Sequence, residues 1–148
     1  ETLYQSETFA QIDLAEYLKS VVRELTRMHH RDDREITVAC SMQPVRIPMS
    51  LAVPCGLIVN ELVTNAFDHA FVGRHAGSLT VSAARHNERY QISVTDDGIA
   101  VAEERLHDST RLRQTLISTL AAQIGGTMSY TPGPPKSFTV TFPAGERA

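Results

Sequence analysis

The sequence predicts an α/β (α+β) two-layer sandwich, in which a mixed, largely antiparallel β-sheet is covered on one face by three helices. Three segments carry apolar residues at helical spacing, and two short segments with the alternating pattern of strands follow each of them. Strand pairs that are close along the chain favour antiparallel pairing, with the helices gathered in one covering layer. With 148 residues, the chain is long enough for one domain with a substantial core.

The first helix is predicted to begin at Asp13, with Glu16 three residues later as its capping-box partner. Its apolar positions are Leu14, Leu18, Val21, Val22, Leu25 and Met28. The charged segment 29–34 then predicts a solvated turn. Residues 36–42 and 45–47 alternate as strands do, so we expect a first strand pair there.

The second helix, predicted over residues 54–71 with Ser50 as N-cap, is the most informative segment of the chain. Its expected core face is Leu57, Ile58, Leu62, Ala66 and Phe67. A polar ridge on the same helix is formed by Glu61, Thr64, Asn65, Asp68 and His69. Polar groups on a mostly buried helix cost desolvation free energy unless they bind a partner, for which a metal ion with a phosphate chain qualifies. The alternative is a solvated outer face.

Strands are predicted again at residues 79–84 and 90–94, joined as a hairpin by the turn at residues 86–88. Asp96-Asp97-Gly98 is a turn signal at the end of the second of these strands. Residues 99–109 show no periodicity and mixed charge, which predicts a mobile loop.

The third helix is predicted to be capped by Asp108 or Ser109 and to end at Gly125-Gly126. Its expected apolar positions are Leu112, Leu116, Leu120 and Ile124. Residues 127–130 and 138–142 predict the last two strands.

Composition excludes several classes of protein. The net charge of −3 gives no general attraction to nucleic acid or to an anionic membrane, and no run looks long enough to span a bilayer. Cys40 and Cys55 lack the spacing of a disulfide framework, so we expect two buried thiols in a reducing cytoplasm. The six histidines have no metal-ligand spacing with these cysteines, which argues against a zinc site.

Two strings, residues 60–70 and 94–100, together resemble the N box and the first glycine box of the Bergerat-fold (GHKL) ATPases. The fuller string over residues 56–66, Gly-Leu-Ile-Val-Asn-Glu-Leu-Val-Thr-Asn-Ala, is most similar to the HWE and HisKA_2 branch of bacterial sensor histidine kinases. Residues 3–18 resemble that branch's junction with its dimerisation helices, and this argues against a serine kinase of the anti-sigma-factor type with the same fold. Residues 123–143 resemble the end of its catalytic domain.

The resemblance implies an ATP-binding catalytic domain in two-component signal transduction. Such a domain transfers the γ-phosphate of ATP to a histidine on a separate domain, with ATP and Mg²⁺ bound. Residues 1–12 would be the lead-in from an upstream dimerisation and phosphoacceptor region, and residues 13–148 the single catalytic domain. Expected partners are that upstream domain and a response regulator, in the cytoplasm, without nucleic acid or direct membrane contact.

By resemblance, Asn65 would bind the Mg²⁺ that bridges the phosphates, and Glu61 would position water at the metal or act as a base. Asp96 would accept a hydrogen bond from the adenine amino group, while Gly98 would let the backbone approach the base. His69 could contact phosphate or close the pocket. The alternatives are packing against a neighbouring aromatic ring for His69 and a simple Asx turn for Asp96.

Five positions depart from the family pattern. Asp68 stands where the family often has lysine, and Ala100 replaces the second glycine of the first glycine box. Arg111 and Arg113 replace the glycines that open the third helix, although both can still attract phosphate, and Lys136 replaces an adenine-holding threonine. These changes support an alternative function: a degenerate module with weak or no ATP binding, acting in phosphotransfer or response-regulator docking.

Overall fold

The computed structural model describes residues 11–98, 108–133 and 135–143. Its elements are β1 (Gln11–Asp13), α2 (Leu14–Met28), β2 (Glu35–Met42), β3 (Arg46–Pro48), α3 (Met49–Asn65), the π-helical turn η1 (Ala66–Ala70), β4 (Ala76–His86), β5 (Arg89–Asp96), α4 (Asp108–Gln123), β6 (Thr127–Thr131) and β7 (Lys136–Pro143). The predicted lead-in lies outside the described residues except for its last two, which belong to β1. Most of the predicted mobile loop, residues 99–107, also lies outside them.

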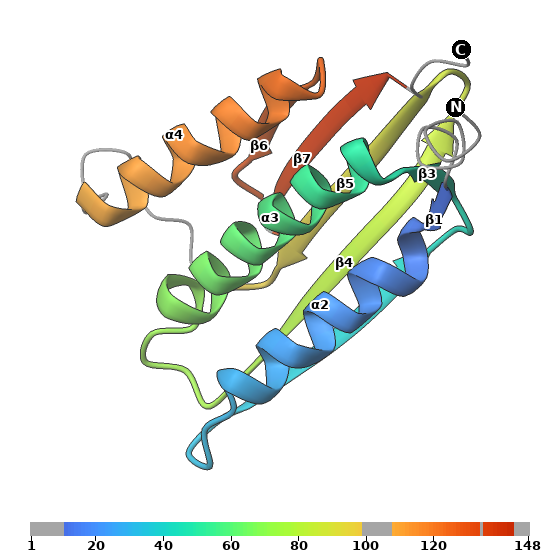
Figure 1. The fold of residues 1–148 in the computed structure, drawn as a ribbon. Helices are drawn as coiled ribbons and strands as arrows, with labels where there is room; N and C mark the ends of the chain where they lie inside the picture. Colours follow the sequence, from blue (N-terminus) through green and yellow to red (C-terminus); the bar gives the residue numbers. More distant parts are fainter. Residues whose placement is uncertain (1–10, 99–107, 134, 144–148) are drawn as a thin grey trace.

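The helices α2, α3 and α4 cover one face of a five-stranded sheet, with α3 between the other two (Figure 1). The strand order is β2-β4-β5-β7-β6, in which β2 and β4 are parallel and the other neighbours are antiparallel. The buried core lies between the helical layer and the sheet. This architecture confirms the predicted two-layer sandwich with a mixed, mostly antiparallel sheet.

The first predicted strand pair is wrong. β3 pairs with β1 in a separate two-stranded sheet, and β2 pairs with β4 instead. β2 and β4 are parallel, so the chain must cross over between them, and α3 provides most of that crossover. The predicted hairpin of β4 and β5 is confirmed, and Asn87 in its turn has a φ of 60°.

Asp13 caps α2 as predicted, since its carboxylate oxygen accepts a hydrogen bond from the Glu16 amide at 3.2 Å. Met28 is not part of the buried face, because its side chain is 62% exposed. The ridge that contains Leu25 continues four residues later with His29, whose ring stacks on Phe67 with centroids 5.0 Å apart. The contact of His29 with Phe67 therefore replaces the core contact that the sequence analysis expected of Met28.

α3 starts at Met49, and its N-cap is Pro48 without a side-chain cap, so the prediction of Ser50 as N-cap is wrong. The helix is buried through Ala52, Cys55, Gly56, Ile58, Val59, Leu62 and Val63. Leu57, predicted for the core, is 48% exposed because it lies one turn before Glu61 on the polar side.

The helical segment Met49–Ala70 is long and apolar enough to cross a bilayer by length and composition alone, and 50% of its most apolar window is buried. The sequence-based statement that no run reaches this length is therefore wrong. A core helix meets the same criteria, and α3 packs between α2, α4 and the sheet as such a helix does.

The two cysteines differ in environment, and both are free thiols. Cys55 is buried in α3, and this burial raises its pKa to about 12. Cys40 is exposed, contrary to the prediction. It lies in β2, an edge strand that α2 covers only in part, so that even Ile36 and Val38 are half-buried.

The predicted apolar stripe of α4 is half confirmed. Leu120, and Ile124 just after the helix, are buried as predicted, but Leu112 and Leu116 are 70% and 43% exposed, and Ile117 and Ala121 are buried in their place. The buried stripe has equally good helical spacing, and α4 contacts β6 and β7 as well as α3. The predicted C-terminal stop is confirmed: Gly125 has a φ of 73°, and the Gly126 amide donates to the Ala121 carbonyl at 2.8 Å.

Leu18 and Met28 offer a direct test of which α2 positions form the core. Leu18→Ala should lower the free energy of unfolding by about 2–5 kcal/mol, because Leu18 is fully buried. The control Met28→Ala should change it by less than about 0.5 kcal/mol. Urea unfolding followed by circular dichroism measures both values. Comparable losses in the two variants would contradict the packing described for α2.

Candidate functional site

The α3 ridge, defined here as Glu61, Asn65 and Asp68, converges on one guanidinium group from α4. Arg113 donates from Nε to Glu61 Oε1 at 2.9 Å and from Nη1 to Asn65 Oδ1 at 3.4 Å. Its Nη1 also lies 3.7 Å from Asp68 Oδ2. The side chains of Arg113 and Glu61 are only 21% and 24% exposed. The ridge therefore binds a cationic group and is not merely a solvated helix face.

The charges around Arg113 make the α3 ridge a cation site. Two carboxylates and one amide oxygen surround a single guanidinium, so one negative charge is left over. Carboxylate and amide oxygens are also the ligands that Mg²⁺ prefers, so this donor set fits the metal implied by the sequence. The anion at Asp68, which departs from the family pattern, is balanced here by a cation that α4 supplies.

The second part of the site is the end of β5. Asp96 is 3% exposed, and its Oδ1 accepts a hydrogen bond from the Gly98 amide at 2.8 Å. Its Oδ2 lies 3.6 Å from Nζ of Lys136, the residue directly opposite on β7. Burial raises the pKa of Asp96, while the Lys136 ammonium and the Gly98 amide oppose that rise. Asp96 thus combines an Asx turn with a buried ion pair.

Gly98 joins the two parts of the site. A Cβ atom at this position would lie 2.2 Å from the carbonyl oxygen of Ala70, at the end of η1. Only glycine allows the strand end and the helix end to approach this closely. The close contact brings together the two motifs that are some thirty residues apart in the sequence.

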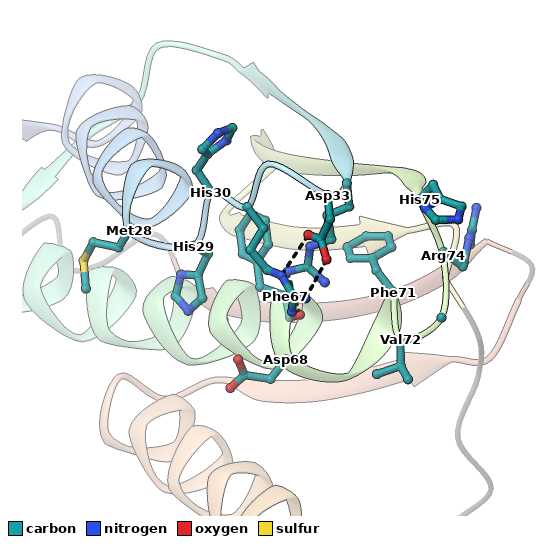
Figure 2. A pocket seen from close by; sticks show the side chains of 13 residues that line it. Met28, His29, His30, Asp33, Phe67, Asp68, Phe71, Val72, Arg74 and His75 are labelled. Carbon is teal, nitrogen blue, oxygen red and sulfur yellow. Dashed lines mark hydrogen bonds and ion pairs between the residues drawn. The ribbon is translucent and has the colours of Figure 1, made fainter.

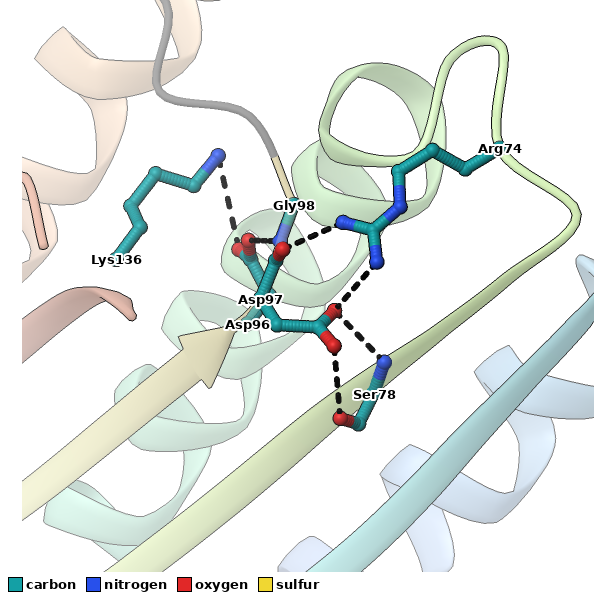
Figure 3. A network of polar contacts seen from close by, with 6 residues as sticks. All are labelled: Arg74, Ser78, Asp96, Asp97, Gly98 and Lys136. Carbon is teal, nitrogen blue, oxygen red and sulfur yellow. Dashed lines mark hydrogen bonds and ion pairs between the residues drawn. The ribbon is translucent and has the colours of Figure 1, made fainter. Parts of the chain in front are cut away.

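Asp97 supports this turn, and sequence reasoning did not single it out. Its carboxylate accepts hydrogen bonds from the Ser78 amide at 2.9 Å and from the Ser78 hydroxyl at 3.3 Å (Figure 3). Arg74, in the loop after η1, donates to the Asp97 carbonyl and lies 3.6 Å from its carboxylate. The sequence signal for Asp97 was its place as the second aspartate of the Asp-Asp-Gly turn. That pattern predicts a turn but does not identify Ser78 and Arg74 as the partners of Asp97.

A pocket of about 650 Å³ lies between the end of α2 and the loop that follows η1 (Figure 2). His29 and Phe67 line it, and Arg34 Nη2 donates to the Phe67 carbonyl at 3.2 Å. Of the α3 ridge, only Asp68 borders this pocket, and its carboxylate points toward α4. These contacts to Phe67 hold η1 in place, and none of Glu61, Asn65, Asp96 and Gly98 lines the pocket.

This geometry agrees with the comparison to known protein families. Residues 52–146 match the family described as histidine kinase-, DNA gyrase B- and HSP90-like ATPases. The chain belongs to this ATPase family. The matched residues include the α3 ridge, the Asp96 turn and α4.

Individual relatives of this ATPase domain are histidine kinases. Blue-light-activated histidine kinase 2 of Erythrobacter litoralis is 29% identical over 125 residues, which are 82% of this chain and 35% of the relative. The chain thus spans about a third of that relative's length. The similarity is consistent with the HWE/HisKA_2 branch expected from the sequence.

Solved structures share the fold. The histidine kinase domain of the blue-light activated kinase EL346 from Erythrobacter litoralis has a TM-score of 0.79 at 24% identity, over 90% of this chain and 62% of that one. AdeS of Acinetobacter baumannii has a TM-score of 0.73 at 17% identity, over 93% of this chain and 68% of that one. The catalytic domain of ThkA, in a nucleotide-free form, has a TM-score of 0.71 at 15% identity, over 91% and 96% of the two chains.

The structure of this ATPase domain brings most of the predicted site residues into two connected groups. Glu61 and Asn65 meet Arg113, and Asp96 meets Gly98. His69 is half-buried in η1. The side chain of Arg111 and all of residue 100 lie outside the described part of the chain.

Arg113 should anchor α4 more strongly than a surface ion pair could. Arg113→Ala should lower the free energy of unfolding by about 1–2 kcal/mol, because it removes two hydrogen bonds to half-buried groups and an ion pair with the exposed Asp68. The matched control is Arg27→Ala, which removes an exposed pair with Glu24 and should cost less than about 0.5 kcal/mol. Urea unfolding of both variants provides the comparison, and equal losses would refute the anchoring role.

Asp97 should make stability depend on pH. The Ser78 amide and then Arg74 hold the pKa of Asp97 below its usual 3.8. A carboxyl with a depressed folded-state pKa stabilises above its unfolded pKa and loses that effect as pH falls through the folded value. Asp97→Asn should therefore reduce stability at about pH 7, and its difference from wild type should shrink below about pH 4. Denaturant unfolding of both proteins across this pH range tests the prediction. A stability difference between them that does not change with pH would contradict it.

Proposed function

We propose that this domain binds Mg²⁺-ATP and acts as the catalytic domain of a sensor histidine kinase, which phosphorylates a histidine on a separate phosphoacceptor domain. The observation that carries the proposal is the contact between its two polar groups. The α3 ridge binds the guanidinium of Arg113. The helical segment that carries the ridge and the buried Asp96 turn meet where Gly98 packs on Ala70. A base site and a metal-phosphate site joined in this way suit a nucleotide triphosphate.

At the base end, Asp96 accepts a hydrogen bond from the adenine amino group. Its carboxylate is buried, so water competes little for this contact. Gly98 lets the base approach the backbone, and the contacts of Asp97 with Ser78 and Arg74 keep the turn in position.

At the phosphate end, Asn65 would hold Mg²⁺, which would neutralise charge on the phosphates. Arg113 would then donate to phosphate oxygens in place of its present contacts with Glu61 and Asn65. Arg111 and His69 add donors to the same chain of phosphates, and Glu61 orients water at the metal or acts as a base. Catalysis by such a site consists mainly of positioning and charge stabilisation.

Four exposed apolar side chains provide a surface for the phosphoacceptor domain: Val53 and Leu57 on α3, and Leu112 and Leu116 on α4. Leu57 lies one turn before Glu61, and Leu116 lies three residues after Arg113. Each of these two leucines is therefore close along its own helix to one partner of the Glu61–Arg113 ion pair, which joins α3 to α4. A partner docked there would face the phosphate end of the site.

The whole protein would then work in two-component signalling in the cytoplasm, where the phosphoacceptor domain passes its phosphoryl group to a response regulator. The named relative is a histidine kinase of which this chain matches 35%. One solved neighbour, ShkA, is described in complex with AMPPNP and shares the fold at a TM-score of 0.71 and 21% identity.

The degenerate docking module is the second candidate, and Lys136 beside Asp96 is the observation in its favour. The kinase function is preferred because Arg113 supplies a positive charge where Asp68 stands in place of the family's lysine, and because Glu61 and Asn65 are intact. Calorimetric titration with a non-hydrolysable ATP analogue separates the two candidates. Binding strengthened by Mg²⁺ supports the kinase function, whereas no heat at millimolar analogue would leave only the docking module.

Asn65→Ala should abolish the effect of Mg²⁺ on analogue binding, because it removes the amide oxygen assigned to the metal. Asp96→Ala should weaken binding with or without Mg²⁺, since that carboxylate contacts the base. The matched control is Thr64→Ala, one residue away on α3, which should retain both affinity and Mg²⁺ dependence. The same titrations give all three results. Mg²⁺ dependence that persists in Asn65→Ala would refute the role of Asn65.

A further inference from the structure

Lys136 is the feature of the base site that the proposed function leaves unexplained. It is the first residue of β7 and lies directly opposite Asp96, the last residue of β5. The side chains of Lys136 and Asp96 are 8% and 3% exposed, with Nζ and Oδ2 3.6 Å apart. An ammonium group is therefore fixed next to the carboxylate that we assign to adenine.

Stability alone does not account for this pair. Moving two charges out of water costs about as much free energy as their attraction returns, so apolar residues usually serve equally well at such a position. The surrounding strands are otherwise apolar on this face, with Val94, Ile92 and Phe138 in the core. A buried acid and base placed side by side at the end of β5, where the nucleotide site is proposed, are better explained by recognition.

The carboxylate of Asp96 has capacity for a further donor. A carboxylate offers about four lone-pair positions. The Gly98 amide uses one on Oδ1, and the ammonium of Lys136 faces Oδ2. An ammonium group likewise has three N–H donors, so one group can face Asp96 and a ligand together. The pair thus presents a hydrogen-bond acceptor and a donor next to each other.

We propose that Lys136 is a specificity-determining residue, which donates a hydrogen bond from Nζ directly to ring nitrogen N1 of adenine while Asp96 accepts from the neighbouring amino group. This inference rests on the proposed function, because it concerns the same nucleotide site. The edge of adenine carries a donor, the amino group, beside an acceptor, N1. Asp96 and Lys136 carry the complementary acceptor and donor in the same order.

The test compares ATP with 1-deaza-ATP, in which N1 is replaced by C–H, by calorimetry on the wild-type chain. Loss of a hydrogen bond from a charged donor should weaken binding about tenfold or more. The ligand control is 7-deaza-ATP, which keeps the N1 edge intact and should bind within about threefold of ATP. This comparison needs no variant, so it does not depend on how a substitution affects folding.

Two variants then assign the effect to Lys136. Lys136→Met has similar length but no donor, so it should bind ATP and 1-deaza-ATP within about twofold of each other. Lys136→Gln keeps a neutral N–H donor and should retain a preference for ATP. Two results would overturn the inference while leaving ATP binding intact. One is the same loss of affinity for 1-deaza-ATP, relative to ATP, in wild type and in Lys136→Met; the other is no such loss in wild type. A wild-type chain that binds no ATP would overturn the proposed function as well.

Discussion

A single guanidinium group, that of Arg113, connects the last helix of the fold to the polar side of its central helix. Glu61 is a half-buried carboxylate on an otherwise apolar helix, and its burial is offset by the Arg113 cation, which also contacts Asn65 and Asp68. Arg113 thus joins α4 to α3 beside the apolar stripe that packs α4 on the core. The contact that helps to stabilise the helical layer also occupies the oxygen atoms of the α3 ridge, so the proposed Mg²⁺-nucleotide would exchange with Arg113 there.

The other half of the site depends on backbone geometry instead of charge. Gly98 packs so closely on the Ala70 carbonyl that the end of β5 and the end of η1 are in direct contact. The π-helical turn that presents Ala70 is held from behind by Arg34 and His29. The Asp96 carboxylate is thereby kept at a fixed place relative to the α3 ridge, which is what recognition of a ligand with a base at one end and phosphates at the other requires.

The sequence was sufficient for the fold class, the cap of α2 at Asp13, the glycine stop of α4 and the polar ridge, because each of these is a local pattern with a local cause. It failed where the outcome depends on which elements meet. Leu57 and Leu116 look like core residues by spacing, but both are exposed because α3 and α4 bury neighbouring positions instead. The pairing of Lys136 with Asp96, and of Arg113 with the ridge, joins residues 40 or more positions apart, so no local pattern could reveal either.

The exchange at Arg113 is the central claim, and NMR of the arginine Nε–H groups in ¹⁵N-labelled protein tests it most directly. The Arg113 signal, assigned with Arg113→Lys, reports the hydrogen bond to Glu61. Addition of Mg²⁺ with a non-hydrolysable ATP analogue should shift this signal, and the analogue with Mg²⁺ should leave it unshifted in Asn65→Ala at the same concentrations. A wild-type Arg113 signal that stays in place when the nucleotide site is saturated would contradict the account.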